Sequence, residues 1–319
     1  MSEATIPFLA PDTPDDQATR LRAMMTAASV APVPRRARVL TISSGKGGVG
    51  KTSACVNLSI LMSQMGWRTT LLDADLGMAN ADVLCGLTPT RRLEQFIGVS
   101  DRARTQETST LTDIAIQAPG GFRLIPGSVG VARMADLSPH ERTRLLGVLD
   151  QLEDDSDLLV VDTGAGLGRE VLSFIHNSDL SLIIATPEPT SIADAYALIK
   201  CAILSAKSPR PPRIALVVNQ VCSKKEADDV HARMASVCER FLRYRLPLLG
   251  WVATDGQVGA AVRHRKPLVL DDPRSPASRD LRRLACVLVE SMELRKARNP
   301  ADRATGLSGL WARLTLRGS

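Results

Sequence analysis

Short apolar runs alternate along this chain with longer segments in which apolar residues recur every three or four positions. Short runs of this kind are typical of buried parallel strands, and the wider spacing is typical of helices. Strands that alternate with helices predict an α/β fold with a doubly wound, mostly parallel sheet and helices on both of its faces. The predicted strands lie at residues 39–42, 69–72, 157–162, 180–186, 214–219 and 248–252, and the predicted helices at 56–65, 193–204 and 230–241.

Three features between these elements carry weaker predictions. Residues 114–116 and 122–125 suggest two short strands joined by a Pro119-Gly120-Gly121 turn. Small residues at 76–86 suggest a mobile loop after the second strand. The helix near residue 230 places four side chains on one apolar face, those of Val230, Met234, Val237 and Phe241.

A glycine-rich loop joins the first predicted strand to the first predicted helix. Gly45, Gly50, Lys51 and Thr52 fit the phosphate-loop pattern G-x-x-x-x-G-K-[ST], in the strand–loop–helix setting that the pattern requires. Glycines let successive backbone N–H groups turn toward one anion, and the helix N-terminus favours negative charge. The lysine can reach the β- and γ-phosphates, and the threonine hydroxyl can bind Mg²⁺. The predicted nucleotide-binding residues are Gly45, Gly47, Gly48, Val49, Gly50, Lys51, Thr52 and Ser53.

Polar side chains end several later strands, at the carboxyl edge that a parallel sheet would place beside this loop. Asp75 follows the second strand, where a carboxylate could orient the water that attacks the γ-phosphorus. Asp162 ends an apolar strand, as the second Mg²⁺ element of phosphate-loop enzymes does. The sequence thus predicts an Mg²⁺ site of Thr52, Asp75 and Asp162, the last acting through water. Asn219 is predicted to hydrogen-bond the base, and Asp255 is included among the nucleotide-binding residues.

Composition narrows the class of protein. A chain of 319 residues that is 44% hydrophobic and 3% aromatic suits one large α/β domain with extensions and an aliphatic core. Because no long uncharged apolar stretch occurs and the acidic N-terminus lacks an apolar signal core, we expect neither a membrane span nor secretion. The six cysteines, scattered without a C-x-x-C pair, predict reduced, mostly buried thiols in a cytosolic protein. The net charge of +6 permits contact with anionic lipid or nucleic acid without arguing strongly for either.

Both ends of the chain differ from the predicted domain at 39–290. Residues 1–38 form an N-terminal extension, with a helical pattern at 15–28 followed by a proline-rich linker. Residues 291–319 begin as a basic, polar tail and end in apolar residues at helical spacing. This spacing predicts an amphipathic helix that binds a membrane surface, although a terminal helix docked on the protein's own core would show it too. The apolar residues are Leu307, Leu310, Trp311 and Leu314.

The loop sequence KGGVGKT, in which Lys46 is a second lysine, resembles the deviant Walker A motif of the MinD/ParA ATPases. The resemblance runs from about residue 39 to residue 291 and includes Asp73-Ala74-Asp75 and Asp162. Two strings are similar to the flagellar-number branch of that family, the FlhG (FleN) proteins: Asp162-Thr163-Gly164-Ala165-Gly166 and TPEPTSIADAYALIK at 186–200. The N-terminal string at 16–22 resembles the activator motif of the same branch.

By this resemblance, ATP and Mg²⁺ would bring two subunits face to face, and Lys46 of each would reach the phosphates held by the other. Lys46, Lys51 and Asp75 would then be the catalytic residues of an ATPase that forms ADP and phosphate. The resemblance implies control of the number and placement of polar flagella by a cytoplasmic protein that binds reversibly to the inner face of the cell membrane, with the cell pole as a candidate site.

The resemblance also implies partners beyond a second copy of the chain and an anionic membrane surface. Gln17, Leu21 and Arg22 would contact and stimulate the signal-recognition-type GTPase FlhF. A flagellar transcription regulator is a further candidate partner.

Other functions on the same fold stay open. A MinD-type cell-division-site ATPase or a ParA-type DNA-partition ATPase would share the site, and a basic face could bind DNA phosphates. A solvated helical surface explains the same residues, so direct nucleic-acid binding is not expected. A cluster-carrier ATPase would need paired cysteines, which the chain lacks. The basic residues in question are Arg263, Arg265, Lys266, Arg279, Arg282 and Arg283.

Overall fold

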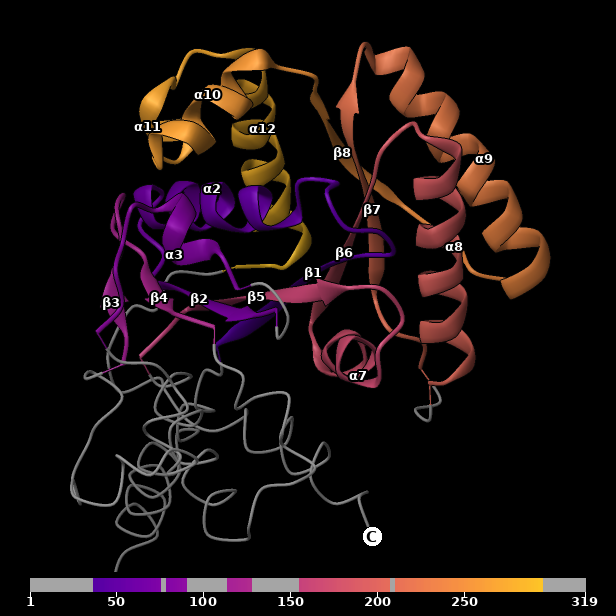
Figure 1. Ribbon diagram of the computed structural model, residues 1–319. Coiled ribbons are helices and arrows are strands. Elements are labelled where there is room, and N and C mark those ends of the chain that lie inside the picture. The colour runs from indigo at the N-terminus through magenta and orange to yellow at the C-terminus, as the bar shows by residue number, and fades with distance from the viewer. Residues whose placement is uncertain (1–36, 76–78, 91–113, 128–154, 207–209, 295–319) are drawn as a thin grey trace, which may run out of the picture.

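In the computed structural model, the described residues are 37–75, 79–90, 114–127, 155–206 and 210–294. Their strands form one eight-stranded sheet in the order β3-β4-β2-β5-β1-β6-β7-β8 (Figure 1). Every neighbouring pair is parallel except β3 and β4, which confirms the predicted α/β class. The strands are β1 (Arg38–Ser44), β2 (Thr69–Ala74), β3 (Ile116–Gln117), β4 (Arg123–Ile125), β5 (Leu158–Ala165), β6 (Leu180–Ala185), β7 (Ile214–Val221) and β8 (Leu248–Ala253).

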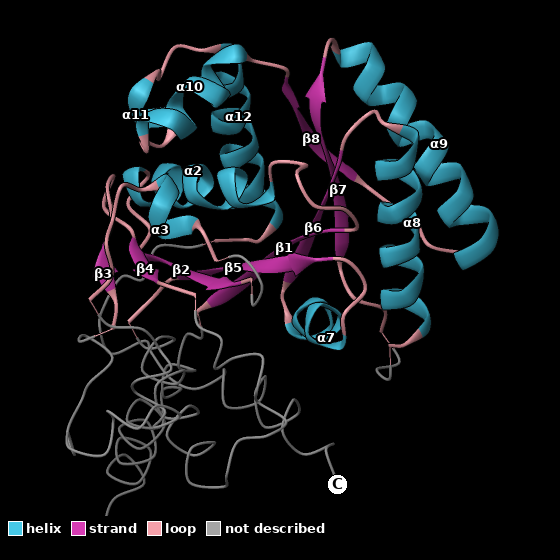
Figure 2. Ribbon diagram, viewed as in Figure 1, coloured by secondary structure: helices cyan, strands magenta, loops and turns pink. Residues whose placement is uncertain are grey.

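Helices cover both faces of the sheet (Figure 2). One apolar cluster packs the first group of helices against one face, and a second cluster packs the other group against the opposite face. The first group is α2 (Lys51–Gln64), α3 (Ala81–Leu84), α10 (Gly256–His264), α11 (Leu268–Asp271) and α12 (Pro276–Ser291). The second group is α7 (Arg169–Asn177), α8 (Pro189–Leu204) and α9 (Lys224–Leu242).

The position of β1 decides where a ligand can bind. β1 pairs with β5 on one side and with β6 on the other, so the strand order reverses next to it. In doubly wound sheets the crevice at such a point, outside the carboxyl ends of the strands, is where ligands bind. Because the strands around β1 are parallel, the segments that follow β1, β2, β5, β6, β7 and β8 all leave the sheet at this edge.

Helix α2, which follows β1, is buried on nearly every side. Its residues from Ala54 to Met62 are buried, including the polar Asn57 and Ser59. The cause is its position between the sheet and helices α11 and α12, so no side of it needs to be polar. Asn57 Oδ1 accepts a hydrogen bond from the backbone N–H of Val269, at 2.9 Å, which joins α2 to α11.

The structure corrects two of the weaker predictions and refines a third. The predicted loop at 76–86 contains helix α3 at Ala81–Leu84. Phe241 does not share the buried face of α9: its side chain is 64% exposed, because the buried stripe of that helix runs through Val230, Met234 and Cys238. The predicted antiparallel pair forms as β3 and β4, with both glycines of its turn at positive φ.

Several predicted features lie outside the described residues. They are the N-terminal helix with Gln17, Leu21 and Arg22, residues 76–78 of the predicted loop, and the tail with Leu307, Leu310, Trp311 and Leu314. Within the described part of the chain, no helix combines the length and the apolar character needed to cross a membrane.

Candidate functional site

The phosphate loop leaves the carboxyl end of β1 and runs directly into α2. Gly48 has φ 80° and Gly50 has φ 87°, a left-handed conformation that favours glycine. Gly50 is the N-cap of α2, so the loop delivers the chain onto the positive end of that helix. A side chain at Gly45 would collide with the backbone of Asp194 in α8, which shows how closely the loop packs against that helix.

Lys51 is the first residue of α2 and is buried beside two carboxylates. Its Nζ donates to Asp162 Oδ1 at 2.5 Å and lies 3.8 Å from Asp75 Oδ2. Asp162 is fully buried at the end of the apolar part of β5, and Asp75 follows β2, the strand that pairs with β5. Burial by itself would lower the pKa of Lys51, but Asp162, Cys55 and Asp75 together outweigh burial and raise that pKa above its ordinary value. Lys51 is therefore a cation, held among the groups that the sequence predicted to surround it.

The donor set at this place fits a bound nucleotide with Mg²⁺. Asp162 Oδ2 is buried and has no hydrogen-bond partner among the described residues, which is costly for a carboxylate oxygen unless a ligand or water supplies one. The described residues hold no group of three or more His, Cys, Asp or Glu side chains that could bind a metal ion. Mg²⁺ characteristically uses one or two carboxylates together with substrate phosphates and water, so such a group is not needed here.

The side chain of Lys46 is exposed at the surface of the phosphate loop, whereas that of Lys51 is buried. Its Nζ donates to Glu188 Oε2 at 2.8 Å and to Thr190 Oγ1 at 3.0 Å. Glu188 is the N-cap residue of α8, and Thr190 belongs to the first turn of that helix. Ser44 Oγ donates to the carbonyl oxygen of Lys46 at 2.9 Å, which holds the backbone of the loop at this point. Lys46 is thus directed along the surface toward α8.

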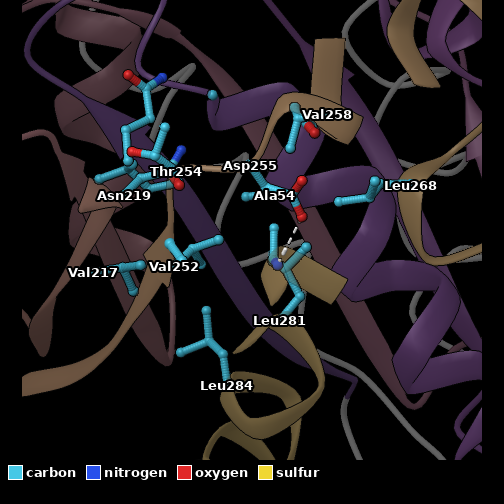
Figure 3. Close-up of a pocket in the computed structure, with 16 residues that line it drawn as sticks. Ala54, Val217, Asn219, Val252, Thr254, Asp255, Val258, Leu268, Leu281 and Leu284 are labelled. Atoms are coloured by element: carbon cyan, nitrogen blue, oxygen red, sulfur yellow. Dashed lines mark hydrogen bonds between the residues drawn. The ribbon is translucent and has the colours of Figure 1, made fainter. Parts of the chain in front are cut away.

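A cavity of about 190 Å³ opens beside the phosphate loop, between α2 and the ends of β7 and β8 (Figure 3). Its interior is apolar, and its polar lining includes Asn219, Gln220, Thr254 and Asp255. The volume and the apolar walls suit a planar purine base. The structure therefore places Asn219 and Asp255 at one cavity beside the phosphate loop, as a nucleotide-binding role for both requires.

Asn219 and Asp255 also hold parts of the protein together. Asn219 Nδ2 donates to the carbonyl oxygen of Val49 in the phosphate loop, at 2.8 Å. Asp255 accepts hydrogen bonds from the backbone N–H groups of Gln257 and Ala277, at 2.9 and 3.1 Å. Partial burial would raise the pKa of Asp255, but these two N–H groups lower it below its ordinary value. Asp255 thereby joins the loop after β8 to the start of α12.

Sequence reasoning missed three residues at the site. Glu188 and Thr190 belong to the family string at 186–200. The sequence does not identify them as partners of Lys46, because no spacing rule connects residues so far apart along the chain. Gln220 adopts φ 59°, which is unusual for a residue other than glycine, at an irregularity in the pairing of β7 with β8. No signal in the sequence indicates that bulge.

The cysteines and the basic residues also have defined surroundings. All six cysteines are free thiols, but Cys222 and Cys286 are exposed and Cys201 is partly exposed, so the expectation of mostly buried thiols is only half met. The six basic residues considered for DNA binding are all exposed. Two of them are engaged in ion pairs, Lys266 with Asp271 and Arg283 with Asp280. This pairing is typical of a solvated helical surface.

Similarity to known proteins agrees with the geometry. Residues 40–268 match the family model of the CobQ/CobB/MinD/ParA nucleotide-binding domain. The chain is 39% identical over 241 residues to the antiactivator FleN of Pseudomonas aeruginosa, covering 76% of this chain and 82% of that protein. It is 31% identical over 284 residues to the flagellum site-determining protein YlxH of Helicobacter pylori, covering 87% and 89%.

Solved structures support the fold. MinD of Pyrococcus horikoshii, determined as a complex with Mg-ADP, superposes with a TM-score of 0.62 at 21% identity, over 82% of this chain and all of that one. A chain of the MinC:MinD cell division protein complex of Aquifex aeolicus gives a TM-score of 0.61, also at 21% identity, over 80% of this chain and 96% of that one. At these identities the likeness establishes the fold alone.

Proposed function

Because the chain belongs to the CobQ/CobB/MinD/ParA nucleotide-binding family, with relatives in its flagellar-number branch, we propose that it is an ATP-dependent switch that sets the number and placement of flagella. The observation that carries this proposal is the cluster of Lys51, Asp75 and Asp162 beneath the phosphate loop, with Lys46 separate at its crest.

In this proposal the phosphates of ATP lie against the loop from Gly45 to Ser53. Lys51 turns from Asp162 toward the β- and γ-phosphates, and Thr52, Asp75 and Asp162 hold Mg²⁺, with Asp162 acting through water. Bound Mg²⁺ would neutralise charge on the phosphate oxygens. The pairing of Lys51 with Asp162 supports this role, because it keeps the lysine charged and in place before the phosphates arrive.

Hydrolysis requires a water in line with the γ-phosphorus and compensation of the charge that develops. We assign the orientation of that water to Asp75, which lies 3.8 Å from Lys51 Nζ and remains partly exposed. We assign Lys46 to the phosphates of a second subunit. Its exposed position on the loop supports this, because its contacts with Glu188 and Thr190 also lie at the surface, where a partner subunit could replace them.

We assign the base of ATP to the cavity beside Asn219. The hydrogen bond from Asn219 Nδ2 to Val49 uses one of the two N–H donors of that amide, fixes its orientation and leaves Oδ1 as its acceptor. Adenine presents an amino group where guanine presents a carbonyl oxygen. An acceptor held in this way favours adenine, which supports ATP rather than GTP as the nucleotide.

The two ends of the chain would carry the output of the switch. We propose that dimerisation brings two tail helices, with Leu307, Leu310, Trp311 and Leu314, to an anionic membrane together, because two weak anchors bind far more tightly than one. We propose that Gln17, Leu21 and Arg22 contact an FlhF-type GTPase and stimulate it. The similarity to FleN and YlxH supports this flagellar assignment.

The full-length protein with and without the Lys51→Ala substitution tests the central proposal. The wild-type protein is expected to dimerise with ATP and Mg²⁺ in sedimentation velocity, and the variant to remain monomeric because it cannot hold the phosphates. A variant that still dimerises with ATP would overturn the assignment of the site.

Two further changes test the ends of the chain separately. Deletion of residues 307–319 should leave ATP hydrolysis intact and abolish co-sedimentation with anionic vesicles; unchanged sedimentation would make the tail part of the folded domain.

Gln17→Ala should reduce stimulation of the partner GTPase without changing hydrolysis of ATP by this protein. If binding to DNA were stronger than binding to vesicles and weakened with salt, a DNA-partition function would replace the flagellar one.

A further inference from the structure

Asp73 is a buried carboxylate at the end of β2 that the proposed reaction does not use. Its side chain lies in the sheet directly beside that of Asp162, since the two residues are register partners in the parallel pair of β2 and β5. Burying two carboxylates next to each other is costly. A buried acid in such a place needs a structural reason, and its hydrogen bonds show one.

The carboxylate of Asp73 holds both ends of the segment that follows it. Asp73 Oδ1 accepts a hydrogen bond from the backbone N–H of Asp75 at 3.2 Å. Its Oδ2 accepts from the backbone N–H groups of Asn80 and Ala81, at 3.0 and 3.1 Å. One side chain therefore holds both ends of the loop between β2 and α3 and ties them to the sheet.

Asp73 also replaces the missing cap of helix α3. Asn80 is the N-cap residue of α3, but its own side chain makes no capping hydrogen bond. The N–H groups at the start of a helix need acceptors, and a carboxylate is a strong one. Asp73 supplies it from another element, which fixes the position of α3 relative to the end of β2.

A second loop packs against this arrangement from the other side. A Cβ atom at Gly127, after β4, would collide with Ala79 and approach Asp73 Cγ to 3.2 Å. Gly127 thus allows the chain after β4 to pack closely on Asp73 and on the loop that Asp73 holds.

The loop that Asp73 closes begins with Asp75, the residue assigned to the attacking water. Asp75 Oδ2 lies 3.8 Å from Lys51 Nζ, and a Cβ atom at Gly164 would lie 3.6 Å from Asp75 Oδ1. The carboxylate of Asp75 therefore points between α2 and the segment that ends β5. Its backbone N–H is the very group that Asp73 binds, so the direction of Asp75 depends on Asp73.

We propose that Asp73 is a positioning residue that clamps both ends of the loop between β2 and α3, at residue 75 and at residues 80 and 81, and thereby aims Asp75 at the nucleotide. This inference rests on the proposed function for the role of Asp75 but not for the clamp itself. The Asp73 carboxylate accepts hydrogen bonds from the backbone of residues 75, 80 and 81, none of which belongs to the phosphate loop. Loss of Asp73 should therefore impair turnover far more than nucleotide affinity.

Hydrogen exchange of the full-length protein without nucleotide tests the clamp directly. In Asp73→Ala the amides of residues 75, 80 and 81 should exchange at least about tenfold faster than in the wild-type protein, because the hydrogen bond of each to Asp73 is lost. Asp73→Asn keeps one acceptor and should give an intermediate rate. Unchanged exchange at these three amides in Asp73→Ala would overturn the proposal.

Asp157→Ala is the matched control. Asp157 also accepts a hydrogen bond from a backbone N–H, that of Arg68 at 3.0 Å, but at the amino end of β5, where the opposite edge of the sheet lies. Its loss should speed exchange near residue 68 and leave the amides of residues 75, 80 and 81 protected. Acceleration of these three amides in this control as well would show a general loosening and count against a specific clamp.

ATP turnover then tests the consequence for Asp75. Asp73→Ala should lower kcat about tenfold or more and change KM for ATP by less than about threefold, as expected for a loss of orientation rather than of binding. A rise in KM with unchanged kcat would overturn the positioning role. If Asp75→Ala hydrolyses ATP at the wild-type rate, the proposed role of Asp75 fails, while the exchange result still decides whether Asp73 clamps the loop.

Discussion

Lys46 Nζ lies 2.8 Å from Glu188 Oε2, so the lysine assigned to a second subunit is paired with a carboxylate of its own chain. Both side chains are exposed, at 41% and 63%, and exposed pairs contribute only about 0.2–1 kcal/mol. The pair can therefore hold Lys46 in one direction without locking it there. A second subunit that offers phosphates would compete with Glu188 at little cost.

Glu188→Gln tests this competition. Because each dimer contains two such pairs, each worth up to about 1 kcal/mol, removing them should tighten the ATP-dependent dimer, by no more than about thirtyfold in Kd. Sedimentation velocity with a non-hydrolysable ATP analogue measures it, and Lys46→Gln serves as the comparison that should lose the dimer. A weaker dimer in Glu188→Gln would mean that Glu188 supports the interface instead of competing for Lys46.

Lys51→Ala should destabilise the protein as well as abolish nucleotide binding. The substitution leaves Asp162 fully buried without its counter-charge, and breaking a buried ion pair in this way costs about 3–5 kcal/mol. Adding Asp162→Asn removes the stranded charge and should recover a large part of that loss. Urea unfolding without nucleotide measures all three proteins. Equal stability of the single and double variants would show that Asp162 is not left ionised by the loss of Lys51.

Asn219→Ala should weaken ATP binding by about tenfold and reduce the preference for ATP over GTP by a similar factor. It removes both the donor to Val49 and the acceptor assigned to the amino group of adenine. Titration with fluorescent analogues of the two nucleotides gives both quantities. Gln220→Ala, at the neighbouring exposed position, should change neither by more than about threefold. Preserved selectivity in Asn219→Ala would move base recognition to other groups of the cavity.

Asp73 should make the stability of the nucleotide-free protein depend on pH. Burial raises the pKa of Asp73 from 3.8 to about 7, and repulsion from Asp162 adds to the increase. Between pH 3.8 and about pH 7, Asp73 in the folded protein keeps a proton that the same side chain in the unfolded chain has released. The free energy of unfolding should therefore fall as pH rises through this window, by about 1.4 kcal/mol per pH unit for this one group.

Asp73→Asn should remove that contribution to the slope. Urea unfolding of the wild-type protein and the variant at several pH values between 4 and 8 isolates the contribution of Asp73, because the other titrating groups are common to both proteins. The difference in unfolding free energy should change across the window and become constant above about pH 7. Parallel curves throughout would show that Asp73 does not carry the proton.

The sequence alone determined the main strands and helices and which of them carry the residues of the candidate site. Apolar runs of strand length, separated by helical spacing, are local signals, and they indicated six of the strands and the class of sheet correctly. Lys51, Asp75 and Asp162 were also predictable, because residues that end parallel strands must meet at one edge of the sheet. The spacing of the phosphate loop then indicated the strand end at which we propose that phosphate binds.

Tertiary structure decided what these side chains do to one another. That Glu188 receives Lys46, that Asn219 donates to Val49 and that Asp73 binds the N–H groups of residues 75, 80 and 81 all depend on distances between separate elements. The same holds for Phe241, whose exposure follows from where α9 meets the sheet. A sequence pattern specifies which face of an element is apolar, but only packing specifies the partner of each polar atom.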